Sequence, residues 1–296
     1  MKTARLRPPL HRMAGFTLVE SVIVILITGI LAAVVAIFIR APVQGYFDTV
    51  RRAELTDQAD LALRRITRDV RLALPNSVRL STAGGVHYIE FIMTRSGGRY
   101  RDVSDGSTGG DFLSFTNAAD LSFDVHGPLP AMTPGLDSVV VFNLGPGNAP
   151  ADAYVGGNRA LISCIGGACS PALPANTVRL ASNPFANQAP PLSSPNGRFQ
   201  VVPGDVRAVT YSCPVAGAAA GNLTRHWNYG FFAAQPTPPG GSQALLATGA
   251  NCAVSYAPAV GGRHGLLEIR LSLSAGTGTD LETVVLQQQI RVDNAP

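Results

Sequence analysis

The feature that most constrains this chain is an apolar run over residues 16–39, interrupted by a single charged side chain, Glu20. The 19 residues from 21 to 39 carry no charge at all. A helix rises about 1.5 Å per residue, so this stretch is about long enough to cross the ~30 Å hydrocarbon layer of a membrane. A carboxylate in such a span is costly in lipid and is by default functional. The run therefore predicts one membrane-spanning helix with a functional glutamate near its start.

The segment before the apolar run is short and basic. It contains Lys2, Arg5, Arg7 and Arg12 and no acidic residue. Under the positive-inside rule, this leader lies in the cytoplasm and the chain after Arg40 lies outside it. The leader also accounts for the net charge of +4, because it holds four of the 23 basic residues and leaves 19 basic against 19 acidic side chains. The balance after the leader argues against nucleic acid as a partner.

A specific pattern lies at the junction between the leader and the apolar run. The junction reads Gly15-Phe16-Thr17-Leu18-Val19-Glu20, and a patch of small residues follows at Gly29-Ile30-Leu31-Ala32-Ala33. The pattern resembles the type IV prepilin signal, which pilins share with the pseudopilins of type II secretion. The resemblance implies that a prepilin peptidase cuts between Gly15 and Phe16 and methylates the new amino terminus. It also implies that Glu20 serves assembly, by pairing with the amino terminus of a neighbouring subunit or of its own chain.

Two other kinds of segment share part of this pattern. A secretory signal peptide has an apolar region of ~7–15 residues that precedes its cleavage site, whereas this run is longer and its candidate cleavage site comes first. A plain N-terminal membrane anchor explains the length of the run, but neither Glu20 nor the Gly-Phe junction. One difference from many pilins is that Pro42 follows the span and does not lie within it.

A second helical pattern extends from residue 43 to residue 74. Its apolar residues recur at spacings of three and four, typical of an amphipathic helix: Val43, Phe47, Val50, Ala59, Ala62, Leu63, Ile66 and Val70. The opposite face is charged and rich in arginine, either as a solvated surface or as a lateral contact with neighbouring subunits. Pro75 and Asn76 end the pattern. We expect residues 16–39 and 43–74 to form one long helix whose second half packs on a globular head.

The rest of the chain predicts a β-rich, loop-rich head with an antiparallel sheet, and hence an α+β fold class. Short strands are expected at 86–93, 111–115, 121–125, 138–144, 177–181, 198–202, 206–213, 226–232, 266–274 and 283–292. The stretches 145–158, 183–197 and 234–250 are expected to be surface loops. The expected organisation is a leader at 1–15, a transmembrane or filament-core helix at 16–39, an amphipathic helix at 40–75 and a periplasmic head at 76–296.

The four cysteines all lie in the expected periplasmic part, where disulfides form and persist. Cys164 and Cys169 flank a Gly-Gly turn signal, which favours a short closed loop between them; Cys213 and Cys252 then pair with each other. A zinc site is the functional alternative, but the spacings do not resemble paired Cys-x-x-Cys knuckles. No metal and no cofactor is expected.

Catalytic patterns are missing from the sequence, so we expect a protein that is not an enzyme. The five histidines are scattered, and neither a His-Glu-x-x-His pair nor a Gly-x-Ser-x-Gly elbow occurs. Acidic residues near glycines at 102–111 suggest either a polar surface loop or a calcium loop, without the EF-hand spacing. The aromatic cluster of Trp227, Tyr229, Phe231 and Phe232 is expected to pack in the core by strand alternation, with a ligand platform as the alternative.

A narrower resemblance concerns residues 42–46, 51–57 and 64–79, and more loosely 287–296. These stretches resemble minor pilin-like biogenesis components of the mannose-sensitive haemagglutinin (MSHA) type IV pilus. The resemblance implies an assembly subunit of the initiation or tip complex. It would lie in the inner membrane of a Gram-negative bacterium before assembly, with one span. Its partners would be a prepilin peptidase and methyltransferase, other minor and major pilins, the inner-membrane assembly platform and the lipid bilayer. A J-type minor pseudopilin of type II secretion, a tip adhesin and an anchored periplasmic enzyme are the alternatives.

Overall fold

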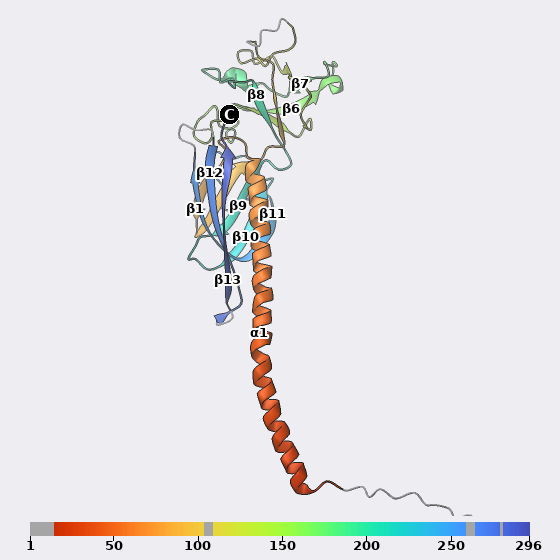
Figure 1. The fold of residues 1–296 in the computed structure, drawn as a ribbon. Coiled ribbons are helices and arrows are strands. Elements are labelled where there is room, and N and C mark those ends of the chain that lie inside the picture. Colours follow the sequence, from red (N-terminus) through yellow and green to blue (C-terminus); the bar gives the residue numbers. More distant parts are fainter. Residues whose placement is uncertain (1–14, 104–108, 259–263, 279–280) are drawn as a thin grey trace, which may run out of the picture. The chain divides into compact units, whose positions relative to one another are not determined.

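A computed structural model of the chain describes residues 15–103, 109–258, 264–278 and 281–296, without the side chains of residues 40, 41 and 44 (Figure 1). The chain divides into two compact units, residues 1–51 and residues 52–296. Of the predicted leader, only Gly15 is among the described residues. The predicted α+β fold class is confirmed, while the expected segment boundaries after residues 15, 39 and 75 stay predictions.

One helix, α1 (Leu18–Arg71), continues through Pro42 without interruption. Proline has no N–H, so this turn has one backbone hydrogen bond fewer. Within residues 52–71, apolar side chains at helical spacing are buried in the core of the head: Leu55, Ala59, Ala62, Leu63, Ile66 and Val70. The helix ends at Arg71 and not at residue 74, because the N–H of Leu72 turns back to the Asp69 carbonyl.

A seven-stranded antiparallel sheet carries this core. Its strands in spatial order are β1 (Arg79–Ala83), β2 (Val86–Ile92), β9 (Ala208–Pro214), β10 (Gly221–Trp227), β11 (Ser242–Ala257), β12 (His264–Ala275) and β13 (Glu282–Asp293). In Figure 1 these strands run alongside the last turns of α1. Alternate side chains such as Phe91, Tyr211 and Ile269 point from the sheet into the same core as the buried face of the helix.

A six-stranded antiparallel sheet forms the other part of the head. Its spatial order is β3 (Ser96–Arg99), β8 (Arg198–Val202), β5 (Ser138–Val141), β6 (Arg159–Ile165), β7 (Thr177–Leu180) and β4 (Ser122–Asp124). Short 3-10 helices lie at η2 (Gly166–Ala168) and η3 (Pro184–Asn187). The sheet has its own core around Phe123 and Phe199. A third cluster, which includes Ile92, Val140 and Val202, joins it to the seven-stranded sheet.

Two of the segments expected near residues 226–250 differ from those in the structure. The predicted strand 226–232 is wrong, because β10 ends at Trp227 and Asn228 adopts a positive φ of 57° that turns the chain into a loop. The predicted loop 234–250 is also wrong in its second half, where the 16-residue strand β11 begins at Ser242. Its alanines and glycines have low strand propensity, but Ala247 and Ala250 are buried in the core, and this packing overrides propensity.

Other strands depend on partners that are distant in the sequence. The predicted strand 111–115 does not form: the N–H of Asp111 donates to the Asp124 side chain. Strands β1, β3 and β6 lack a counterpart among the expected strands. In β3, a Cβ at Gly98 would lie 2.7 Å from the ring of Phe199, so only glycine fits against β8. The remaining predicted strands are present, with ends shifted by a few residues.

Candidate functional site

The start of α1 is defined by a capping residue directly after the Gly15-Phe16 junction. The Oγ1 atom of Thr17 accepts a hydrogen bond from the backbone N–H of Glu20, at 3.3 Å. The Thr17 carbonyl accepts the first intrahelical bond, from the N–H of Ser21, at 3.1 Å. Thr17 and Glu20 have the Ser/Thr-x-x-Glu spacing of a capping box. The spacing of Thr17 and Glu20 in the sequence is the signal from which this role could be predicted.

Glu20 lies in the first turn of α1, where the positive end of the helix dipole favours a carboxylate. Its side chain is exposed. Within the described part of the chain, its carboxylate takes part in no hydrogen bond and no ion pair. The carboxylate is therefore available to a partner that lies outside the described residues.

The apolar segment that follows Glu20 satisfies its own polar groups. Residues Leu18–Ile39 form a 22-residue stretch with a mean hydropathy of 3.2, long and apolar enough to cross a membrane once. Its two hydroxyl side chains bond to backbone carbonyls of the preceding turn: Ser21 Oγ to Thr17 at 3.3 Å, and Thr28 Oγ1 to Val24 at 2.6 Å. An unsatisfied polar group in hydrocarbon costs several kcal/mol. Glu20 is thus the polar side chain of this stretch that lacks a partner within the described residues.

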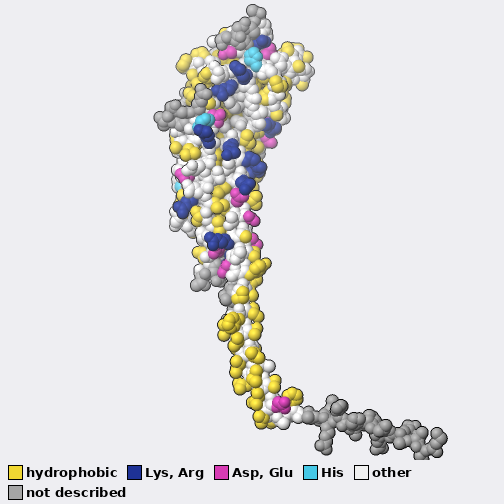
Figure 2. Space-filling view, viewed as in Figure 1, with side chains coloured by type: hydrophobic (Ala, Val, Ile, Leu, Met, Phe, Trp, Pro, Cys, Tyr) yellow, Lys and Arg dark blue, Asp and Glu magenta, His cyan; other side chains and the backbone are white. Residues whose placement is uncertain are grey.

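The exposed face of α1 in the head carries charges of opposite sign at its two ends. Exposed side chains recur at spacings of three and four and form what we term the α1 charge stripe: Glu54, Asp57, Leu61, Arg64, Arg68 and Arg71. Figure 2 shows acidic side chains below basic ones along this part of the molecule. Arg64 also contacts Asp60 at 2.6 Å, as expected for an i,i+4 pair. The basic end borders a groove of about 440 Å³ that reaches Gln288 on β13.

A buried network holds the last turns of α1 on the sheet. The Asp69 carboxylate accepts hydrogen bonds from the hydroxyl of Tyr211 at 2.8 Å and from Arg225 Nε at 2.7 Å. Arg65 lies 3.3 Å from its other oxygen. Burial and then the nearby Asp69 charge raise the pKa of Tyr211, so its hydroxyl stays a donor. The network fixes which face of α1 is exposed, and hence the position of the charge stripe.

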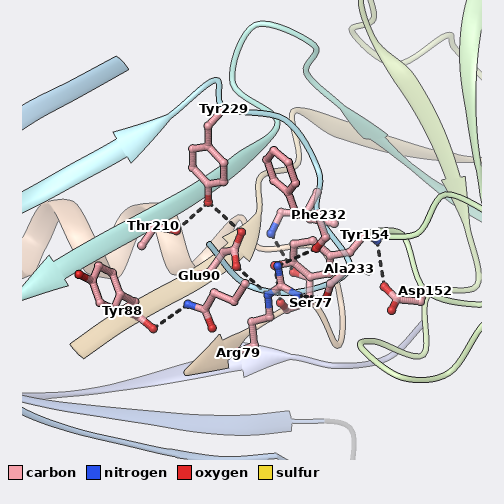
Figure 3. Close-up of polar contacts among 12 residues, drawn as sticks. Ser77, Arg79, Tyr88, Glu90, Asp152, Tyr154, Thr210, Tyr229, Phe232 and Ala233 are labelled. Carbon is pink, nitrogen blue, oxygen red and sulfur yellow. Dashed lines mark hydrogen bonds and ion pairs between the residues drawn. The ribbon is translucent and has the colours of Figure 1, made fainter. Parts of the chain in front are cut away.

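A second buried network, drawn in Figure 3, ties the 228–233 loop to the sheet. Glu90 is fully buried, with Arg79 Nε at 2.6 Å and the hydroxyl of Tyr229 at 2.9 Å from its two oxygens. Arg79 donates to the carbonyls of Phe232 and Ala233 as well. Burial raises the pKa of Glu90, and Arg79 opposes that shift. The Tyr229 and Phe232 rings stack with their centroids 6.5 Å apart. The expected packing of this aromatic cluster in the core is wrong for Phe232, which is 48% exposed, while Tyr229 and Phe231 are partly buried against a core cluster.

The cysteines form two disulfides, between Cys164 and Cys169 and between Cys213 and Cys252, which is the pairing expected from the sequence. Cys213 and Cys252 lie in the core that α1 covers. Among the residues that the structure describes, no group of three or more His, Cys, Asp or Glu side chains is placed to hold a metal ion. Half of the loop that suggested calcium, residues 104–108, lies outside the described residues.

One pair of side chains has the elements of a nucleophile and a base. Ser212 Oγ lies 3.0 Å from His226 Nε2, and burial lowers the pKa of His226. The sequence does not predict this pair, because the two residues come together only where β9 pairs with β10. In the described part of the chain, no carboxylate contacts His226, so the third member of a triad is missing there.

Comparison with known protein families identifies a motif at the start of the chain. The prokaryotic N-terminal methylation motif matches residues 10–36, which include the Gly15-Phe16 junction and Glu20. No curated protein and no solved structure matches the chain. The motif supports a type IV pilin-like protein and implies processing by a prepilin peptidase and assembly with other pilins. It indicates a structural subunit and not an enzyme, and together with α1 it fits a single-pass membrane anchor.

Proposed function

We propose that the chain is a minor pilin-like subunit that helps to initiate or cap a type IV pilus of the MSHA type, similar to the biogenesis protein MshO. The methylation motif supports the pilin-like class, and the resemblance of residues 42–79 supports the narrower role. Cleavage after Gly15 would leave a chain that begins with N-methylated Phe16. Residues 16–39 would then lie in the inner membrane, residues 40–75 would continue the spine, and residues 76–296 would form the periplasmic head.

The observation that carries this proposal is the carboxylate of Glu20, which has no partner within the described residues and lies at the start of an apolar helix whose hydroxyl groups bond to its own backbone. In lipid a lone carboxylate is costly, which gives the helix a reason to find a cationic partner. Processing creates such a cation, the free amino terminus of Phe16 on a neighbouring subunit. Pairing would form as the helix leaves lipid for the filament, and it would fix the position of one subunit relative to the next.

The α1 charge stripe supports a filament in which neighbours are displaced along the axis. Subunits anchored in one membrane have parallel helices, and two level copies of the stripe would place like charges opposite each other. Asp57 and Arg68 are separated by about 16 Å at ~1.5 Å per residue. A displacement of about that length brings the acidic end of one stripe beside the basic end of the next. This is the lateral contact that the arginine-rich face suggests.

The proposal is tested by replacing Glu20 with Gln or Leu in cells. We expect processing and membrane insertion to stay nearly normal, while incorporation into sheared filaments falls by more than about tenfold because a desolvated ion pair is lost. Ser21→Ala is the matched control, since the Ser21 hydroxyl is satisfied by the backbone. Normal piliation in a Glu20→Leu strain, when a deletion strain is defective, would exclude the role of the carboxylate.

A J-type pseudopilin shares the prepilin signal, so the pilus role needs its own experiment. We expect cross-linking of the full chain in its native membrane to capture type IV pilus subunits and the pilus assembly platform. Capture of type II secretion components in their place would assign the chain to a pseudopilus. Binding of the full chain to host surfaces or sugars, with normal filament number in the deletion strain, would instead indicate an adhesin.

A further inference from the structure

A cavity of about 310 Å³ in the head is lined by the six-stranded sheet and by two connecting segments, and α1 contributes none of its lining residues. The six-stranded sheet contributes Ser138 on β5 and Arg159 on β6 to its wall. The β8–β9 connection contributes Arg207, and the 228–233 loop contributes Phe231. None of these residues has a role in the proposed assembly function. The volume suits a small organic molecule.

Arg159 lines this cavity, and its guanidinium has no anionic partner among the residues that the structure describes. Its Cζ atom lies 3.6 Å from the centroid of the Phe231 ring, which holds one face of the group. Its Nε is buried and, among the described residues, has no hydrogen-bond partner. Burial and the charge of Arg207 lower the pKa of Arg159 to about 10. Arg159 is half-buried, and a cation withdrawn from water is normally paired with a carboxylate; here the same cavity is lined by a second cation, Arg207.

Arg207 reaches the cavity from a strained backbone. Its φ is 61°, in the left-handed region of backbone conformation. A residue other than Gly, Asn or Asp in this region destabilises the fold by an amount of order 1 kcal/mol. Its Nε donates to the carbonyl of Gly204 at 2.9 Å, which holds the guanidinium in place. In the described residues neither Arg207 nor Arg159 forms an ion pair with a carboxylate. Glycine would relieve the backbone strain at this position but would remove the guanidinium from the cavity.

We propose that the cavity between Arg159 and Arg207 is a binding site for an oxyanion, a carboxylate or phosphate group carried by a small molecule. Two guanidinium groups offer the planar donors that such groups prefer. The hydroxyl of Ser138 is a further donor in the wall, and Phe231 is an apolar surface for the rest of the ligand. A bound oxyanion supplies the negative charge that the two arginines lack and removes their mutual repulsion.

The test uses the full chain in a non-ionic detergent, titrated calorimetrically with potassium phosphate and, separately, with sodium benzoate at constant ionic strength. We expect saturable binding of at least one of the two. Tighter binding of benzoate assigns the site to organic acids, and tighter binding of phosphate assigns it to phosphate groups. Both Arg159→Gln and Arg207→Gly should weaken binding by about ten- to hundredfold.

A charge control and a folding check separate loss of the site from general effects of charge and from misfolding. Arg291→Gln removes an exposed arginine of β13 and should bind like the parent chain. Arg207→Asn tolerates the left-handed backbone and should fold, with a thermal midpoint at or above that of the parent, yet lose binding. The proposal is overturned if the parent binds neither probe at millimolar concentration, or if the pocket variants and Arg291→Gln bind alike. Neither result bears on pilus assembly, which the Glu20 experiment tests separately.

Discussion

Arg225 Nε lies 2.7 Å from Oδ2 of Asp69, and both side chains are less than a tenth exposed. The two residues are 156 positions apart, one on α1 and one on β10. Removal of one member of a buried pair leaves the other as an uncompensated charge, which typically costs 3–5 kcal/mol. The pair therefore anchors the last turns of α1 to the seven-stranded sheet, and a substitution in it tests how much this contact stabilises the head.

We expect Asp69→Ala to lower the free energy of unfolding by about 3–5 kcal/mol, because Arg225 and the Tyr211 hydroxyl both lose their acceptor. Urea unfolding of the full chain in detergent measures it. Asp60→Ala is the matched control, since it breaks the exposed pair with Arg64 and should cost no more than about 0.5 kcal/mol. Equal effects of the two substitutions would contradict the anchoring role of Asp69.

Replacement of Gly15 by a bulky residue such as Leu should block processing. The small residue precedes the predicted cleavage bond, and the precursor should accumulate in the membrane with its leader attached. Mass spectrometry of the intact protein and Edman sequencing check the outcome. Gly29→Ala, which meets no atom within 4 Å of the new Cβ, should be processed normally. A mature chain that begins anywhere but at Phe16 would contradict the prepilin interpretation.

A charge reversal on the α1 charge stripe should weaken assembly without affecting the fold. Arg68→Glu places an acid at the basic end of the stripe, where it would repel the acidic end of a displaced neighbour. We expect a several-fold lower yield of cross-linked filament complexes and an unfolding free energy within about 0.5 kcal/mol of the parent. Arg291→Glu, an exposed change outside the stripe, is the control. If both variants assemble equally well, the stripe is a solvated surface only.

The two disulfides should differ in their contribution to stability. The Cys213–Cys252 bridge spans 39 positions and the Cys164–Cys169 bridge spans 5. In the chain-entropy model these loops correspond to roughly 4 and 2 kcal/mol. Replacing both cysteines of a pair by alanine, one pair at a time, should therefore destabilise the head more for the longer loop. Thermal unfolding under non-reducing conditions compares the variants, and the reverse order would count against the entropic account.

Local patterns in the sequence predict the long helix α1 and the candidate processing segment. The apolar run, the Gly15-Phe16 junction and the spacing of Ala59, Ala62 and Ile66 all act within a few helical turns, so their periodicity predicts α1. The short spacing between Cys164 and Cys169 likewise predicts a closed loop. These features depend on neighbours along the chain, and a sequence shows such neighbours directly.

Only the tertiary structure decided the features that depend on contacts between distant segments. β11 is a strand because Ala250 is covered by the core, although its composition disfavours a strand. Asp69 meets Arg225 because α1 packs on the seven-stranded sheet, and Arg159 on β6 shares a cavity with Arg207 of the β8–β9 connection. No local pattern specifies either contact. Whether a charge is solvated, paired or left facing another charge depends on burial and on the partner that the fold supplies. For these residues the sequence determined the kind of side chain, and the packing of the two sheets determined what it does.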